Sequence, residues 1–204
     1  MSKIPTRLST LAAALLLTSG GAWSTETAPE DPVLVSIEEA AQFYREGDYS
    51  EAVSSLNLAV QQIQEKKGAT LADLLPEPLE GWVADAAESQ VAAASMLGGG
   101  LSVERSYRRE QANVQIQIVA DSPMLQAVMM MFANPMFASA DGGRMERIGR
   151  QKAIVKYDSA TGHGSINAVV ANRFLITLEG QGASEEELRA YAALVDFEKI
   201  AALP

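Results

Sequence analysis

The chain of 204 residues contains no cysteine and a single histidine, His163. The absence of cysteine excludes disulfides, thiolate metal sites, thiol catalysis and a lipid anchor attached through cysteine. His163 lies between Gly162 and Gly164, and no set of metal-ligand spacings or nucleophile motif accompanies it. We therefore interpret His163 as an exposed turn residue, and we expect no metal site and no other cofactor.

Positive charge and long apolar runs are also scarce. The chain has 16 Lys and Arg against 26 Asp and Glu, a net charge of −10. An acidic surface repels phosphate backbones, which argues against a nucleic-acid partner. No segment after the N-terminus approaches the ~20 apolar residues that a membrane-spanning helix needs. We expect neither nucleic-acid binding nor a transmembrane segment in the mature chain.

The first 24 residues have the three parts of a secretory signal peptide. Lys3 and Arg7 give a positive start, and the apolar run of residues 11–18 is too short for a membrane span. Ala22 and Ser24 place small residues at the −3 and −1 positions of a cleavage site. These features predict cleavage after Ser24 and a periplasmic or secreted protein. An uncleaved amphipathic anchor helix is the alternative, which the lack of a recurring polar face disfavours.

Residues 36–67 are predicted to form a helical hairpin. Ser36 and Glu39 have the spacing of a capping box, and Asp48 and Glu51 repeat this spacing directly after Gly47. The second helix is expected to end at Lys66-Lys67-Gly68, since cations and a following glycine are favoured at helix C-termini.

The same segment places small residues where the two helices would touch, aromatic residues at the corner and a glycine at the turn: Ile37, Ala40, Phe43, Tyr44, Gly47, Tyr49, Ala52, Leu56 and Ala59. This pattern resembles one tetratricopeptide repeat, although the usual leading Trp, a Leu and the closing Pro are absent. The resemblance implies a hairpin that cannot bury its apolar faces alone, because about three such units are normally stacked. We expect it to pack on the rest of the chain or to dock on another protein.

From Leu101 onward, apolar and polar residues alternate, which predicts β-strands. Two strands precede a helix that begins at Ser122-Pro123, four strands follow it, and a last helix starts with the capping box of Ser184 and Glu187. We therefore expect an α+β fold, with the hairpin followed by an antiparallel sheet in the order β-β-α-β-β-β-β-α and helices on one face. The expected parts are a signal peptide (1–24), a flexible mature N-terminus (25–35), the hairpin (36–67), a linker (68–81) and an α+β domain (82–204).

The most unusual segment is rich in methionine and phenylalanine. It contains Met129, Met130, Met131, Phe132, Met136 and Phe137. Three interpretations are open: packed core, a copper(I) site built from thioethers, and an adaptable recognition surface for a partner or ligand. The copper interpretation is disfavoured because no histidine and no repeated Met-x-x-Met spacing support it.

These observations together suggest a non-enzymatic envelope protein. We expect the Met/Phe-bearing helix to bind an envelope protein, with the hairpin as an additional docking surface. The alternative is a carrier of a small apolar molecule or lipid, in which the helix of residues 123–133 covers a cavity. A third possibility is a hydrolase assembled only by the fold from residues such as Glu104, Tyr107 or Asp121, since no Gly-x-Ser-x-Gly motif is present.

Overall fold

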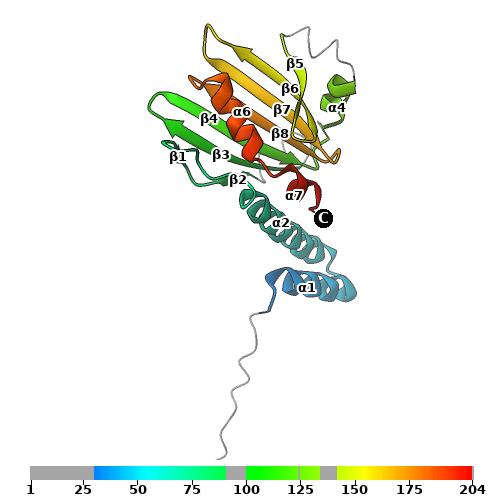
Figure 1. The fold of residues 1–204 in the computed structure, drawn as a ribbon. Helices are drawn as coiled ribbons and strands as arrows, with labels where there is room; N and C mark the ends of the chain where they lie inside the picture. Colours follow the sequence, from blue (N-terminus) through cyan, green and yellow to red (C-terminus); the bar gives the residue numbers. More distant parts are fainter. Residues whose placement is uncertain (1–29, 91–99, 124, 134–141, 204) are drawn as a thin grey trace, which may run out of the picture. The chain divides into compact units, whose positions relative to one another are not determined.

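An N-terminal pair of helices is followed by a sheet and three further helices in the computed structural model, which describes residues 30–90, 100–123, 125–133 and 142–203. The elements are α1 (Pro32–Glu46), α2 (Tyr49–Ala72), β1 (Val83–Ala84), β2 (Glu88–Gln90), β3 (Leu101–Arg109), β4 (Ala112–Ala120), α4 (Leu125–Ala133), β5 (Arg144–Ile148), β6 (Gln151–Asp158), β7 (His163–Val170), β8 (Phe174–Gln181), α6 (Glu185–Leu194) and α7 (Phe197–Ala201) (Figure 1). The predicted α+β class, with its N-terminal helical pair and antiparallel sheet, is confirmed. None of the helices in these ranges combines the length and apolarity needed to cross a bilayer.

Helix α1 begins earlier than the sequence pattern indicated. Its N-cap is Asp31, whose side chain accepts a hydrogen bond from the Val33 amide at 2.9 Å, and Pro32 occupies the first turn. The predicted cap at Ser36 is wrong, because the Asp-Pro pair already supplies both an acceptor and a preset backbone angle. Ser36 lies buried inside the helix, where its hydroxyl donates to the Pro32 carbonyl at 3.1 Å.

Helix α2 ends later than predicted, so residues 68–72 of the expected linker are helical. Gly68, predicted as the glycine that ends the helix, lies within it and is buried. A Cβ added there would lie 2.2 Å from the Ser89 Oγ of β2. The glycine is therefore needed for the close approach of β2, rather than for a left-handed helix end.

The eight strands form one antiparallel sheet. The order is β1-β3-β4-β8-β7-β6-β5, with β2 also paired to β3. Strands β5 to β8 follow one another as a meander, and β8 closes it against β4, where Ile116 pairs with Leu178. Helix α4 connects β4 to β5, the strand at one edge of the sheet, and α6 lies across the sheet in Figure 1.

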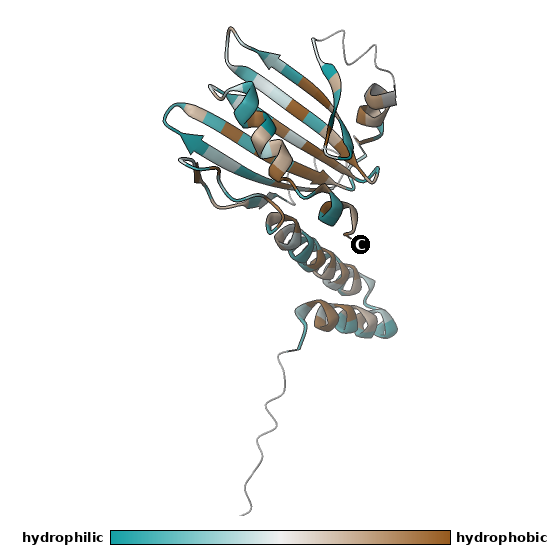
Figure 2. Ribbon diagram, in the orientation of Figure 1, coloured by the Kyte–Doolittle hydropathy of each residue, from teal (hydrophilic) through white to brown (hydrophobic). Residues whose placement is uncertain are grey.

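The main core lies on one face of this sheet. Hydrophobic and hydrophilic residues alternate along the strands (Figure 2). The buried set continues into the end of α2 and into α6 and α7, through residues such as Leu71, Leu188 and Ile200. Tyr191 of α6 packs edge-on against Trp82 at 5.4 Å between ring centroids. No described residue of α4 belongs to this cluster, although its Leu125 is buried.

Candidate docking surface

The two hairpin helices contact each other through small side chains. The buried residues are Val33, Ser36 and Ala40 on α1 and Ala52, Ser55 and Ala59 on α2. The Ser36 hydroxyl also lies 3.3 Å from the Gln62 side-chain oxygen across the interface. These mostly small residues bring the two backbones close together, and most of the larger apolar side chains of the hairpin do not take part in this contact.

Those larger side chains are left exposed. Nine of the twelve exposed large apolar residues in the described part of the chain belong to the hairpin. Eight of them, each with 41–66% of its surface exposed, follow a spacing of three, four or seven residues along each helix, and we call them the hairpin face: Leu34, Ile37, Tyr44, Tyr49, Val53, Leu56, Val60 and Ile63. This spacing places the side chains of each helix in one line.

The two lines lie on the same side of the hairpin. On each helix, the line of exposed apolar side chains lies about a quarter turn around the helix axis from the residues that contact the other helix. Because the two helices run antiparallel, both lines then face the same side of the hairpin. Contacts at both ends agree with this geometry. Leu34 and Ile63 line one groove of ≈ 330 Å³ at the open end. Tyr44 and Tyr49 meet at the corner, with ring centroids 5.6 Å apart. The hairpin face is therefore continuous.

The border of the hairpin face is charged at its open end, where Asp31, Lys66 and Lys67 line the groove with Leu34 and Ile63, but carries little charge elsewhere. Beyond its outer edge on α2 the residues are uncharged: Ser50, Ser54, Asn57, Gln61 and Gln64. On α1, Glu38 and Arg45 flank the line with opposite signs. This border contrasts with the net charge of −10 of the whole chain.

Helix α2 is attached to the α+β domain at its C-terminal end. Leu71 enters the main core, and the Lys67 ammonium donates to Asp121 Oδ2 at 2.8 Å. Arg173 also donates to Asp121, at 3.2 Å. The hydrogen bond from Lys67, reinforced by Arg173, lowers the pKa of the Asp121 carboxyl. These contacts hold α2 in place while the hairpin face remains exposed.

The Met/Phe segment is partly within the described residues. Met130 is 69% exposed, and Met129 and Phe132 are half-buried. Helix α4 includes Met131, but its side chain is not described, and Met136 and Phe137 lie outside the described residues. The recognition surface predicted there remains a prediction, with Met130 as its exposed apolar side chain.

The three residues considered for a hydrolase are not brought together. Glu104 and Tyr107 point to opposite faces of β3, and the Gln115 amide donates to Glu104 Oε2 at 3.0 Å. Tyr107 is buried and donates to the Pro76 carbonyl at 2.7 Å, and its burial raises the pKa of the phenol. Asp121 follows β4 and pairs with Lys67. The fold therefore assigns separate structural contacts to these residues.

His163 is the first residue of β7 and is exposed. It lines an open groove with Tyr157, Asp158 and Ser165. Asp158 accepts hydrogen bonds from the Ala160 amide and the Thr161 hydroxyl, which lower the pKa of its carboxyl. Within the described residues, no group of three His, Asp or Glu side chains is placed to hold a metal ion.

An apolar pocket lies where α2 meets β8. Leu71, Phe174 and Leu203 contribute to its lining, and its volume is ≈ 70 Å³. Pockets that enclose small organic ligands usually have at least ~300 Å³. This pocket is too small for a lipid, so it does not favour the carrier alternative.

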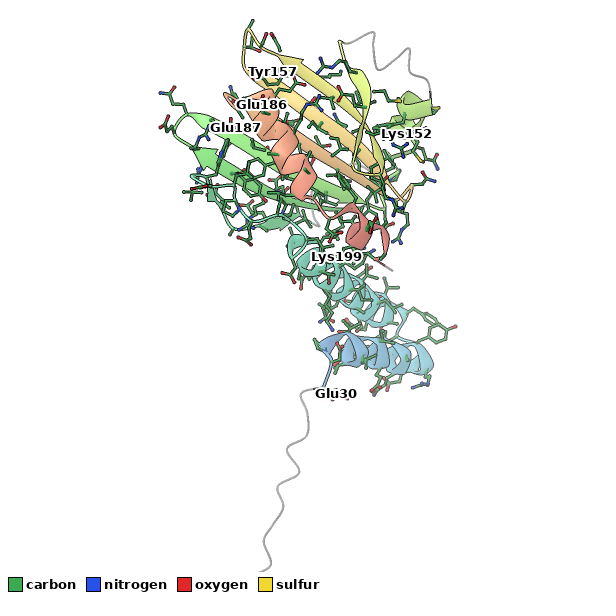
Figure 3. All side chains as sticks on the ribbon, viewed as in Figure 1. Glu30, Lys152, Tyr157, Glu186, Glu187 and Lys199 are labelled. Carbon is green, nitrogen blue, oxygen red and sulfur yellow. The ribbon has the colours of Figure 1, made fainter. Side chains whose placement is uncertain are left out.

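The first turn of α6, which contains Glu186 and Glu187 (Figure 3), is held by ion pairs of Arg189. Arg189 binds both oxygens of Glu146 on β5, at 2.8 and 3.1 Å, and also Glu185 at 2.8 Å. The hydrogen bonds from Arg189 lower the pKa of both carboxyls. The acidic run of this helix therefore has structural partners, in addition to the predicted capping box of Ser184 and Glu187.

Sequence reasoning named the hairpin as an additional docking surface but did not identify its residues. The signal was present in the spacing of Tyr49, Val53, Leu56, Val60 and Ile63, which is typical of a helix that packs on other helices. Ala52 and Ala59 made this signal hard to recognise, because they belong to the same apolar stripe of α2. The structure shows that α1 covers these two alanines.

Comparisons of this chain with protein-family models, with curated protein sequences and with solved structures give no match.

Proposed function

We propose that this protein is an exported, non-enzymatic interaction module that binds a protein chain through the hairpin face. The observation that supports the proposal best is the continuous row of eight large apolar side chains on a hairpin whose own interface is already filled. Apolar surface of this extent on a soluble domain is typical of interaction sites. The tetratricopeptide resemblance points to the same use, since one such unit leaves an apolar face for a neighbour.

A photo-crosslinking amino acid placed at single positions in intact host cells tests this proposal. Val53 lies in the hairpin face, Leu58 is similarly exposed on the opposite side of α2, and Met130 represents α4. We expect a protein adduct of defined mass from position 53 and none from position 58. Adducts from position 130 with none from position 53 would contradict binding through the hairpin face and favour binding through α4. The absence of adducts from both positions would contradict the proposal that the protein is an interaction module.

The exported location is tested separately. Fractionation of the host and N-terminal sequencing of the mature protein should give Thr25 as its first residue. Retention of residues 1–24 in a membrane-bound chain would favour the anchor-helix alternative instead.

A further inference from the structure

We infer that the hairpin face is the interface of a homodimer, in which the hairpins of two copies pack face to face as a four-helix bundle. This inference rests on the proposed function and names its partner, a second copy of the chain.

The spacing of the hairpin face suits helices as the occupant. Val53, Leu56 and Val60 repeat every three and four residues, as side chains do when they insert between residues of a facing helix. An antiparallel pair of such helices offers two lines side by side, which is half of a four-helix bundle. A second hairpin supplies the other half with the same spacing.

The charge pattern favours a second copy over a partner of opposite charge. Two chains with a net charge of −10 repel each other, so they associate best through a surface without acidic residues. None of the eight residues of the hairpin face is charged, and its outer border on α2 is uncharged as far as Gln64. The charged residues at the open end are in ion pairs, Lys66 with Asp31 at 2.7 Å and Lys67 with Asp121 at 2.8 Å. A basic partner would instead be recognised by carboxylates around the apolar row, and Glu38 is balanced there by Arg45.

The exposed area is also sufficient for a specific dimer. Tyrosine side chains have about 150–250 Å² each, the six aliphatic side chains have less, and all eight are about half exposed. Together they expose roughly 700 Å², close to the ~800 Å² that one partner contributes to a standard interface.

Matched substitutions on the two sides of α2 test the inference. Leu56 is 49% exposed within the hairpin face, and Leu58 is 46% exposed about 200° away around the helix. Sedimentation equilibrium of the purified chain should give twice the monomer mass. Leu56→Glu should weaken association at least ~100-fold, whereas Leu58→Glu should remain a dimer. Because both positions are exposed, both variants should retain the wild-type circular dichroism spectrum.

The lack of cysteine provides a second measurement that does not depend on a disruptive substitution. In single-cysteine variants, a short bis-maleimide should link two copies through Val53→Cys or Leu56→Cys, but not through Leu58→Cys.

A wild-type chain that stays monomeric at ~100 μM, or a Leu56→Glu variant that stays dimeric, would overturn the homodimer. If position 53 then still crosslinks in cells to a different protein, identified by mass spectrometry, the interaction module stands and its partner is another chain. If neither self-association nor any adduct is found, the proposed function fails as well.

Discussion

The rings of Tyr44 and Tyr49 meet across the corner of the helical hairpin, with centroids 5.6 Å apart and planes inclined by 58°. Both side chains nevertheless keep about two thirds of their surface in solvent, at 66% and 63%. Two aromatic side chains therefore form an exposed edge at the end of the hairpin face, and tyrosine is a residue type enriched in interfaces.

Replacing Tyr44 by alanine should weaken self-association and leave the free energy of unfolding nearly unchanged. The exposed ring pair contributes about 1 kcal/mol or less to monomer stability, so urea unfolding should shift only slightly. Self-association should weaken at least ~10-fold, because truncated tyrosine anchors commonly cost more than 1 kcal/mol. Leu58→Ala, a truncation outside the hairpin face, serves as the control and should leave association unchanged. Equal effects of the two variants on association would argue against a role for the corner.

Gly68→Leu should destabilise the folded chain by about 1–3 kcal/mol through overpacking. A side chain at this position meets the Ser89 Oγ and then Leu101, so β2 must move away from α2. Ala69→Leu at the neighbouring exposed position of the same helix should change stability by no more than about 0.5 kcal/mol. Urea unfolding of both variants measures the difference. A neutral Gly68→Leu would mean that α2 and β2 are not in close contact in solution.

Tyr107→Phe should lower the free energy of unfolding by about 1 kcal/mol. The substitution removes the buried hydrogen bond that the phenol donates to the Pro76 carbonyl at 2.7 Å, and it changes little else in the core. Tyr49→Phe, at an exposed ring, should be close to neutral in the same urea experiment. If both variants unfold as the wild type does, the contact between Tyr107 and the segment before Trp82 does not stabilise the fold.

The ion-pair cluster at α6 should make stability depend on acid pH. Hydrogen bonds from Arg189 lower the pKa of Glu146 below its usual 4.5, so the folded state binds a proton less readily than the unfolded chain. The resulting stabilisation is complete above about pH 4.5 and is lost as the pH falls through the lowered pKa.

In Arg189→Gln, the decline in unfolding free energy as the pH falls below about 4.5 should therefore be shallower than in the wild type. Arg150→Gln is the control, since Arg150 and Glu198 form an ion pair whose side chains are 85% and 74% exposed, and such pairs contribute little. Urea unfolding at a series of pH values measures both slopes, and an unchanged slope in Arg189→Gln would contradict the role assigned to this cluster.

Local patterns in the sequence were sufficient for strands β3 to β8, but not for the short strands β1 and β2, which lack an alternating pattern and pair at the edge beside β3. The alternation of Val114, Ile116 and Ile118 predicted the buried face of β4, because successive strand residues point to opposite sides. The capping box of Ser184 and Glu187 likewise predicted the start of α6, because both of its hydrogen bonds are made within one turn.

Features that depend on distant parts of the chain were predicted less well. Gly68 has the local context of a helix end, yet α2 continues through it because β2 needs the space that a side chain would occupy. Ser36 has the spacing of a cap, yet it lies inside α1 because Asp31 supplies a cap one turn earlier. For Gly68 the packing of β2 on α2 decides the outcome, whereas for Ser36 the cap at Asp31 decides it.

The sequence by itself determined that this chain has an acidic composition, no thiol chemistry, an antiparallel sheet and a helical hairpin, since each of these follows from residue content or from the period of the hydrophobic pattern. Only the tertiary structure decided which apolar residues of the hairpin are covered. Ala52 and Leu56 lie on one apolar stripe of α2, but α1 approaches so closely that it covers the alanine and leaves the leucine in solvent. The hydrophobic period of one helix does not specify where a neighbouring helix packs. The position of α1 against α2 therefore decides which side chains form the hairpin face.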